Sequence, residues 1–521
     1  MAYKLTYATM FNPPEALHQD YEQALEELKQ DLGLEYGMII KGKDHFSEQK
    51  FESINPADYT QVLGIFQSGT KQDANEAIKA AKSAFTDWRK TPYQERVRVL
   101  RKTADLIDQR VHKIAAAISL EVGKNRMEAL GDVAETADLI RYACDQMEEN
   151  DGFFFKMGED PLEGFSVTNY SILKPYGVWI VISPFNFPAA LSGGPVAAAL
   201  VTGNTVVLKP ATDTPWSVRL LSECFLDAGI PDGVFNYVTG SGRIMGNALV
   251  EHPEVDGITF TGSYNVGMDI YSSFGKGKYV RPVILELGGK NPVIVSKNAN
   301  LERAIAGITR SAFGLQGQKC SAASRIYIES PVYDEVVHRF IEATEKLKIG
   351  DPTKRDTYLG PVINRKAYQD FKDFTEELNQ AGTILSGGKT LNHDLKNGLY
   401  CQPTIVANVP HTHKLWKQEM FLPITMVHRV ENLDQAMKLA NDVNYGLTAG
   451  FYGDKIETQW FFDHIQAGVN YANRPQGATT GAWPGYQPFG GWKGSGSSGK
   501  NAGGRYYLQL YMREQIRTRV E

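Results

Sequence analysis

Short apolar segments alternate with helical segments from residue 177 to 289, and this alternation limits the fold more than any other feature of the sequence. The expected strands are GVWIVISP (177–184), TVVLKP (205–210), GVFNYVTG (233–240), GITFTGS (257–263) and RPVILELGG (281–289). Strands separated by helices of about ten to fifteen residues favour right-handed βαβ crossovers and a parallel sheet. The pattern therefore predicts an α/β protein with a dinucleotide-binding architecture.

The same alternation restarts after residue 289 and predicts a second α/β unit. Its expected strands and helices are 291–295, 301–314, 324–330, 333–347, 426–430 and 433–443. Upstream, apolar residues recur every three or four positions over 73–90, 95–123 and 127–147, which predicts helices that cover one face of the first sheet. At 521 residues the chain is too long for one core.

Two segments, 151–171 and 499–521, fit neither unit and resemble edge strands that pair with a partner chain. We expect residues 1–150 and 172–287 to form an NAD(P)-binding domain and residues 288–498 a catalytic domain. The two remaining segments would form an oligomerisation flap.

Charge and cysteine content exclude several classes of function. A net charge of -5 and a pI near 6.1 provide no basic surface for nucleic acid. The most apolar stretch, 176–203, is interrupted by prolines, so no membrane helix is expected, and the N-terminus lacks a signal core. Four scattered cysteines argue against disulfides and a metal site, which favours a reducing, cytoplasmic setting.

Cys320 lies in GQKCSAASR (317–325), where every neighbouring side chain is small or flexible. A reactive cysteine needs access, but a lone loop cysteine is more often inert. Glu286 ends an apolar strand, the place where parallel sheets carry their sites, and could act as a general base. The alternative is a solvated glutamate paired with Lys290.

A dinucleotide-binding GxGxxG loop is absent after the first strand, where SPFNFP stands. Glycines occur later, in FTGSYNVG (260–267), where backbone N–H groups at a helix start could meet a pyrophosphate. The alternative is an ordinary helix cap.

Taken together, PFNFP, LKP, FTGS, ELGGK, GQKC, QEMF, YGLTAG and PFGGWKGSG occur in an order and spacing that resemble the aldehyde dehydrogenase superfamily almost end to end. The resemblance implies a Rossmann-type cofactor domain, an α/β catalytic domain and a β-flap that joins at least two identical subunits. It also implies a small-molecule substrate.

The resemblance also implies roles for individual residues. Cys320 would attack an aldehyde, the Asn186 amide and the Cys320 N–H would form the oxyanion hole, and Glu286 would activate water. From propensity alone, Asn186 could instead be a turn residue. The implied cofactor is NAD, with NADP possible because Thr212 stands where NAD-selective relatives often carry an acid. The cofactor residues would be Ser183, Pro184, Phe185, Lys209, Thr212, Gly242, Phe260, Thr261, Gly262, Ser263, Val266, Leu287, Glu419 and Phe421.

The segments around Cys320 and before QPFGG look most like the branch that oxidises L-glutamate γ-semialdehyde, the open form of 1-pyrroline-5-carboxylate. In that branch the positions matching Ser321, Gly481 and Ala482 hold the substrate carboxylate. Gly477 and Ala478 are an alternative pair. Phe185 and Phe489 would enclose the aliphatic chain, and Glu135 could lie near the substrate or be a solvated helix residue.

Two positions depart from the family pattern: Leu422 replaces a common glycine, and Phe185 replaces a common tryptophan. Three other functions therefore remain open: oxidation of another semialdehyde or aliphatic aldehyde, acyl transfer to coenzyme A, and an inactive cofactor-binding or structural homologue. Retention of Glu286 speaks against acyl transfer, because a thiol acceptor needs no water-activating base. An inactive homologue would be expected to have lost Cys320, Glu286 or Asn186.

Overall fold

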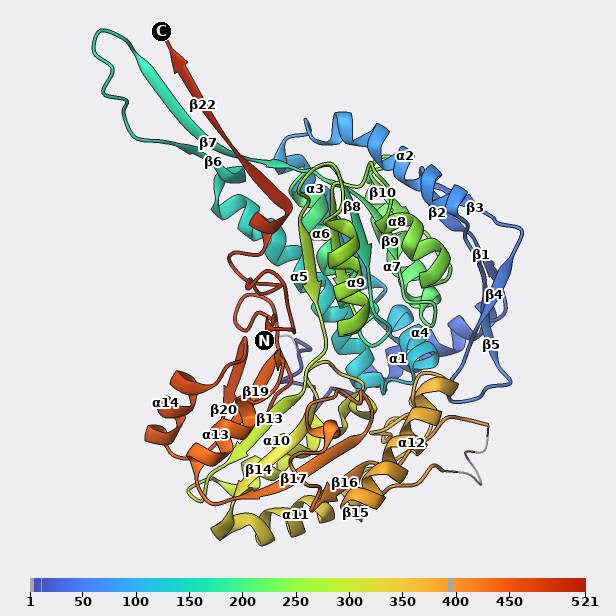
Figure 1. Cartoon of the computed structure of the whole chain (residues 1–521). Helices are drawn as coiled ribbons and strands as arrows, with labels where there is room; N and C mark the ends of the chain where they lie inside the picture. Colours follow the sequence, from blue (N-terminus) through green and yellow to red (C-terminus); the bar gives the residue numbers. More distant parts are fainter. Residues whose placement is uncertain (1–3, 11, 392–394, 396) are drawn as a thin grey trace.

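The computed structural model describes residues 4–10, 12–391, 395 and 397–521. Residues 1–3 and 11 of the expected cofactor domain, and residues 392–394 and 396 of the expected catalytic domain, lie outside the described residues. Two α/β lobes are stacked on each other, and a narrow β-sheet projects from one of them (Figure 1). The predicted α/β class is confirmed.

The sheet of the first lobe has the strand order β12-β11-β8-β9-β10-β2-β3, and the five strands from β12 to β10 are parallel. The chain order reverses between β8 and β11, and such a switch point is where open α/β sheets bind ligands, beyond the carboxyl ends of their strands. Two short antiparallel strands that the sequence did not predict, β2 and β3, extend one edge. The strands are β2 (Met38–Ile40), β3 (Lys43–His45), β8 (Val178–Ile182), β9 (Thr205–Lys209), β10 (Phe235–Tyr237), β11 (Gly257–Thr261) and β12 (Val283–Glu286).

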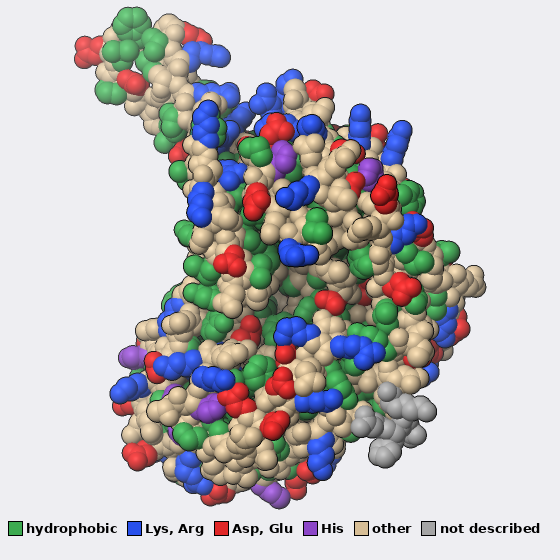
Figure 2. All heavy atoms as spheres, turned by 45° about the vertical axis from the view of Figure 1, so that its right-hand side comes forward, with side chains coloured by type: hydrophobic (Ala, Val, Ile, Leu, Met, Phe, Trp, Pro, Cys, Tyr) green, Lys and Arg blue, Asp and Glu red, His purple; other side chains and the backbone are tan. Residues whose placement is uncertain are grey.

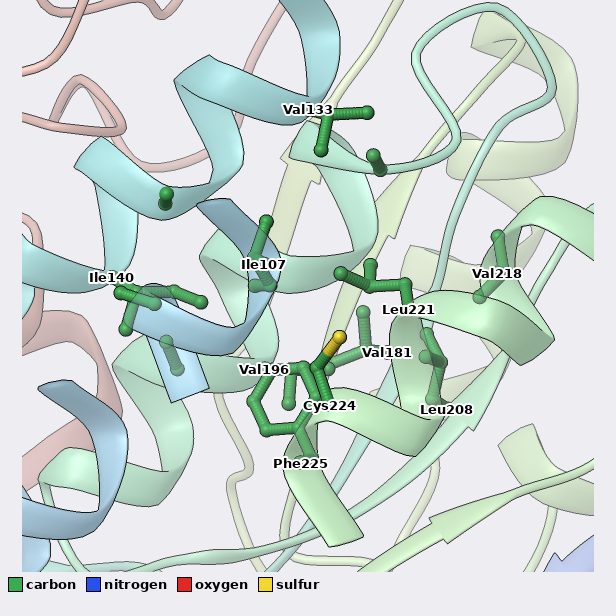
Figure 3. Close-up of a cluster of buried hydrophobic side chains, with 14 of the residues drawn as sticks. Ile107, Val133, Ile140, Val181, Val196, Leu208, Val218, Leu221, Cys224 and Phe225 are labelled. Carbon is green, nitrogen blue, oxygen red and sulfur yellow. The ribbon is translucent and has the colours of Figure 1, made fainter. Parts of the chain in front are cut away.

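Helices cover both faces of this sheet, because its strands carry apolar side chains on both sides. Trp179 and Val181 of β8 face one core, part of which Figure 3 shows between α3, α5, α6 and α7. Val178 and Ile180 face the other, under α2, α8 and α9. The helices of this lobe are α1 (Glu15–Leu28), α2 (Lys71–Trp88), α3 (Tyr93–Gln109), α4 (Val111–Val122), α5 (Arg126–Glu149), α6 (Ala190–Val201), α7 (Pro215–Ala228), α8 (Asn247–Val250) and α9 (Tyr264–Phe274).

Two expectations about these helices are wrong. The run 73–90 does not share a face with the later helices, because the alanine-rich stripe of α2 packs on the opposite side of the sheet from α3 and α5. The run 95–123 is two helices, α3 and α4, because Arg110 leaves the helical region at φ -105°, ψ 12°.

The second lobe has a seven-stranded sheet of order β15-β16-β17-β14-β13-β19-β20, in which only the edge strand β15 is antiparallel. The predicted strands and helices of this unit are all present. The strands are β13 (Asn291–Val295), β14 (Ala323–Glu329), β15 (Thr383–Ser386), β16 (Thr404–Ala407), β17 (Ile424–Val430), β19 (Thr448–Tyr452) and β20 (Val469–Ala472). The helices are α10 (Leu301–Phe313), α11 (Tyr333–Glu345), α12 (Arg365–Ala381), α13 (Leu433–Asn441) and α14 (Lys455–His464).

The projecting flap is an antiparallel sheet of β6 (Phe154–Lys156), β7 (Val167–Pro175) and β22 (Met512–Val520). It differs from the expected segments at both ends: β7 continues to Pro175, and residues 499–511 contain no strand of the flap. Leu508 and Tyr511 instead pack into the core of the first lobe. Hydrophobic side chains gather at the flap tip (Figure 2).

Two further small sheets complete the described structure. One contains β1 (Glu35–Tyr36), β4 (Lys50–Ile54) and β5 (Val62–Gln67), and the other contains β18 (Tyr445–Gly446) and β21 (Trp492–Lys493). Across the described ranges, the helices are all too short or too polar to cross a membrane.

Candidate active site

A cavity of about 880 Å³ lies between the two lobes, where the molecular surface is indented (Figure 2). It begins at the carboxyl ends of the first lobe's strands and is closed by loops of the second lobe. The predicted site residues that line it are Glu135, Pro184, Phe185, Asn186, Thr261, Gly262, Ser263, Glu286, Leu287, Cys320, Ser321, Glu419, Phe421, Gly481, Ala482 and Phe489.

Cys320 and Glu286 meet because the chain crosses between the lobes at Gly288 and Gly289. Glu286 ends β12, and β13 begins a few residues later beside β14, with Asn291 opposite Ala323. The Asn291 amide donates to the carbonyl oxygens of Cys320 at 2.7 Å and of Ala322 at 2.9 Å. Parallel pairing of β13 and β14 therefore fixes the nucleophile's backbone beside the end of β12.

Cys320 differs from the other three cysteines in its exposure. Cys144, Cys224 and Cys401 are buried, and burial raises the pKa of Cys224 to about 12. Cys320 is partly exposed and lines the cavity. Its own pKa is raised by burial of the sulfur and by the nearby carboxylates of Glu419 and Glu286, while the Ser321 and Cys320 backbone N–H groups oppose this shift. The thiol is therefore accessible, but its raised pKa disfavours the thiolate form.

The loop before Cys320 has an unusual backbone that contacts from the first lobe hold in place. Leu315, Gln316 and Gly317 all have positive φ, of 50°, 56° and 66°. A Cβ on Gly317 would lie 2.2 Å from the Leu422 carbonyl oxygen, so glycine is required there. The Glu128 carboxylate accepts a hydrogen bond from the Leu315 N–H and pairs with Lys319. Such strain persists where the surroundings over-determine the backbone, as around a reactive group.

Asn186 is buried after β8, and its side-chain amide donates to the Gln318 carbonyl oxygen at 2.9 Å. One amide hydrogen is used in this way, and the second is left for another acceptor. Asp132 fixes the start of α6 by accepting from the Ala190 N–H at 2.8 Å and pairs with Lys124 at 3.2 Å.

Glu286 is buried, which overturns the alternative of a solvated glutamate paired with Lys290. Within the described residues, neither the Glu286 Oε2 atom nor the Lys290 Nζ atom has a hydrogen-bond partner. Burial raises the pKa of the Glu286 carboxyl well above its usual value and lowers that of Lys290 to about 7. A buried carboxyl of high pKa has the basicity that proton abstraction from water requires.

Most of the expected cofactor residues lie at or just after the ends of β8, β9 and β11, around the switch point. Gly242 follows β10, Val266 lies in α9 and Leu287 follows β12. Ser263 is the N-cap of α9 but makes no side-chain cap, so the helix start stays open toward the cavity. Lys209 is buried at the end of β9, and burial lowers its pKa to about 8. The expected residues that do not line this cavity are Ser183, Lys209, Thr212, Gly242, Phe260 and Val266.

Glu419 accepts from the Gly289 N–H at 2.8 Å and has a pKa raised to about 7 by burial. It lies so close to the chain crossing that a Cβ on Gly288 would come 2.2 Å from its Oε2 atom. Phe421, at φ 57°, packs edge-on against Phe185 at 5.8 Å.

The expected substrate residues surround the other side of Cys320. The carbonyl oxygen of Ser321 accepts from the Thr479 hydroxyl at 2.7 Å, which holds Ser321 against the 474–487 loop. Arg474 donates to the Gly481 carbonyl oxygen at 3.1 Å, and Gly481 has φ 104°. Of the two Gly-Ala pairs, Gly481 and Ala482 line the cavity, whereas Ala478 is packed in the core beneath it.

Sequence reasoning missed the contribution of the N-terminal segment. The Tyr7 hydroxyl donates to Glu135 at 2.9 Å, and the Tyr7 ring packs edge-on against Trp483 at 5.4 Å. Glu135 is half-buried, accepts this bond and lines the cavity, so it is not a solvated helix residue. Burial, reinforced by Asp132, raises the pKa of Glu135 to about 8. No sequence signal links positions so far apart. Lys319 stands next to the cysteine in the sequence, but nothing in the sequence indicates that Glu128 is its buried partner.

Comparisons with known proteins agree with this geometry. The model of the aldehyde dehydrogenase family matches residues 43–516. The chain is 39% identical over 505 residues to 1-pyrroline-5-carboxylate dehydrogenase of Geobacillus sp. (strain WCH70), covering 96% of this chain and 95% of that protein.

Among solved structures, 1-pyrroline-5-carboxylate dehydrogenase from Thermus with bound NAD superposes with a TM-score of 0.92 at 33% identity, covering 98% of this chain and 97% of that one. Proline utilization A from Bdellovibrio bacteriovorus also gives 0.92, at 35% identity over 97% of this chain. This chain spans only 52% of that protein. The fold is that of the aldehyde dehydrogenases, and the chain belongs to the aldehyde dehydrogenase family.

Proposed function

We propose that this protein oxidises L-glutamate γ-semialdehyde, formed from 1-pyrroline-5-carboxylate, to L-glutamate with NAD. Relatives at 39% identity over nearly the whole chain are 1-pyrroline-5-carboxylate dehydrogenases. The observation that carries the proposal is the placement of Cys320, Asn186 and Glu286 on one cavity, with Ser321 and the Gly481–Ala482 pair beside the sulfur.

In the first step the Cys320 thiolate attacks the aldehyde carbon, and a C–S bond forms while the carbonyl π electrons move to oxygen. The Asn186 amide and the Cys320 N–H donate to that oxygen, which is worth about 3–4 kcal/mol per donor in comparable sites. When bound, NAD supplies the acceptor for the hydride that leaves the substrate carbon. The acyl group is then a thioester of Cys320.

In the second step Glu286 takes a proton from water while the water oxygen attacks the thioester carbon. The C–S bond breaks, L-glutamate leaves, and the Cys320 thiolate is restored. The raised pKa of the buried Glu286 carboxyl matches it to this proton transfer.

Substrate choice is assigned to an anion site that Ser321, Gly481 and Ala482 form on the wall of the same cavity. The Ser321 hydroxyl makes no hydrogen bond within the described residues and can donate to a carboxylate, together with backbone N–H groups at Gly481 and Ala482. Charge-assisted bonds of this kind contribute about 1.5–3 kcal/mol each. Phe185 and Phe489, which both line the cavity, would enclose the aliphatic part.

The residues around the switch point fit the dinucleotide. The uncapped start of α9 at Ser263 offers backbone N–H groups to a pyrophosphate. Lys209 is a buried cation and Glu419 is a half-buried carboxyl on the cavity wall, and both are polar groups suited to the two riboses. Thr212 carries no charge that would repel a 2'-phosphate, so the assay includes NADP.

The proposal is tested by steady-state assay of reduced-nicotinamide formation. Pyrroline-5-carboxylate, succinate semialdehyde and propanal are each supplied with NAD and with NADP. We expect the highest kcat/KM with pyrroline-5-carboxylate and NAD. Good turnover of propanal without turnover of pyrroline-5-carboxylate would refute the substrate assignment. Cys320→Ala should abolish turnover and leave NAD binding intact.

We also infer a homodimer or larger homo-oligomer, built through the flap. Exposed hydrophobic residues gather on it: Phe154, Phe155, Met157, Leu162, Phe165, Ile516 and Val520. An exposed apolar patch on a projecting sheet is typical of an interface. A monomeric mass by light scattering would contradict this inference. The unpaired cysteines support a reducing, cytoplasmic setting, which fractionation of source cells would test.

A further inference from the structure

A second, smaller cavity adjoins the active site behind Glu286. It lies between α5, α6 and the 502–508 segment, and six residues line both cavities: Leu139, Ala190, Leu191, Thr261, Glu286 and Ala502. Its volume is about 40 Å³, room for on the order of one to three water molecules. The cavity therefore reaches Glu286 from the side of α5 and α6.

Two buried acceptors on its wall have no donor. The Oε2 atom of Glu286 and the Oε1 atom of Gln146 make no hydrogen bond to any described residue. Gln146 is 3% exposed and Glu286 7%. Buried oxygens without protein partners are normally satisfied by ordered water, and here both residues line a space that can hold it.

Tyr507 provides a donor on the same wall through a chain of hydrogen bonds. Trp179 Nε1–H donates to the Thr259 hydroxyl at 2.9 Å, which lies 3.0 Å from the Tyr511 hydroxyl. The Tyr511 hydroxyl lies 2.9 Å from that of Tyr507.

Thr259 is 1% exposed, so its proton needs a partner, and Tyr511 is the one within reach. If Thr259 donates its hydrogen bond to Tyr511, Tyr511 donates in turn to Tyr507. Every hydroxyl hydrogen in this series of hydrogen bonds then has an acceptor except that of Tyr507. In this arrangement the Tyr507 O–H has no acceptor among these groups, and Tyr507 lines the small cavity.

We propose that this cavity is a water chamber that supplies the hydrolytic step, with Tyr507 and Gln146 as positioning residues for water bonded to Glu286. The inference rests on the proposed role of Glu286. In the thioester state the acyl chain occupies the main cavity beside Cys320. Water held behind Glu286 reaches the base without passing this chain. Tyr507 donates a hydrogen bond to a water oxygen and remains protonated throughout. Glu286 accepts the proton that the attacking water loses.

The test measures decay of the thioester directly by rapid acid quench after a single turnover with pyrroline-5-carboxylate and NAD. The variants are Tyr507→Phe, which removes the donor, and Ala198→Val, which fills the chamber from α6. Each should slow thioester decay roughly threefold to tenfold, the effect of one hydrogen bond. The rate of hydride transfer in the same experiment should be unchanged. Hydroxylamine, which attacks the thioester without a base, should restore turnover.

Tyr237→Phe is the matched control, because it also removes a buried phenol, one that donates to the Pro215 carbonyl oxygen at 2.8 Å. Normal thioester decay in both Tyr507→Phe and Ala198→Val would overturn the proposal. So would an equal slowing of hydride transfer, which would indicate a general packing defect. Glu286→Gln separates failure of the water chamber from failure of the proposed general base. If Glu286→Gln does not slow thioester decay, the assignment of Glu286 as the base fails. If Glu286→Gln slows decay and the chamber variants do not, only the chamber fails.

Discussion

A Cβ on Gly289 would lie 2.4 Å from the carbonyl oxygen of Cys320. The chain crossing between the two lobes and the backbone of the nucleophile are therefore in direct contact. Asn291 completes this contact by donating to the same carbonyl oxygen. The separation of the thiol from Glu286 is consequently set by backbone packing.

Gly289→Ala should lower kcat/KM roughly 100-fold, because a shift of about 1 Å at a reacting centre has an effect of this size. The new methyl group would also press on the Asn291 amide atoms at 2.7 and 2.9 Å. The measurement is steady-state kinetics together with the thermal midpoint. Gly275→Ala is the control, since its Cβ would meet only the Tyr271 carbonyl oxygen, at 3.4 Å. Wild-type activity in Gly289→Ala would show that the contact does not position the thiol.

Ser321→Ala should raise KM for pyrroline-5-carboxylate about tenfold and leave propanal turnover unchanged. The reason is the loss of one charge-assisted hydrogen bond to the carboxylate, which propanal lacks. Ser324→Ala is a suitable control, because Ser324 lies in β14 and is not among the residues that line the cavity. An equal effect on both aldehydes would assign Ser321 to the nucleophile's geometry and not to substrate choice.

Much of this architecture was predictable because it is encoded locally. Strands β8, β9, β11 and β12 are short apolar runs bounded by glycine, proline or polar residues, and the residues at their ends include Asn186 and Glu286. The flap strands were visible as segments that fit neither unit.

What could not be predicted depends on contacts between distant segments. Helix α2 lies on the opposite face of the sheet from α3 and α5 because its alanine stripe fits the core on that face. The stripe alone does not indicate which face of the sheet the helix covers. The Tyr7–Glu135 bond and the Lys319–Glu128 pair join residues more than a hundred positions apart. The unpartnered state of Glu286 Oε2 depends on packing around β12, which no motif describes.

The pH dependence of the Cys320 thiol's reactivity should shift when Glu419 is replaced by glutamine. Burial and the carboxylates of Glu419 and Glu286 raise the pKa of Cys320, so the thiolate fraction rises with pH and is small at neutral pH. Glu419→Gln removes one of these negative charges and should lower that pKa. Alkylation of the thiol by iodoacetamide should then reach half its maximal rate at a lower pH. Glu431→Gln, at an exposed position, is the control. An unchanged alkylation profile in Glu419→Gln would show that the carboxylate does not act on the thiol.

The buried pair of Lys124 and Asp132 should contribute strongly to stability. Both side chains are fully buried, their charged atoms are 3.2 Å apart, and the Lys124 ammonium lies 3.6 Å from the centre of the Phe187 ring. Asp132→Asn leaves the ammonium buried without its counter-charge. We expect a loss of about 3–5 kcal/mol in the free energy of unfolding, the usual effect of breaking one side of a buried pair.

Urea unfolding followed by tryptophan fluorescence measures this loss, and Asp108→Asn is the matched control. Asp108 forms an exposed pair with Arg141 at 2.6 Å, and such pairs contribute about 0–1 kcal/mol. Since Asp132 also accepts from the Ala190 N–H at the start of α6, its loss should displace the neighbouring Asn186 and lower the rate of hydride transfer. Equal stability of the two variants would show that the buried pair is replaceable, and normal hydride transfer in Asp132→Asn would show that Asn186 is held by its bond to Gln318 alone.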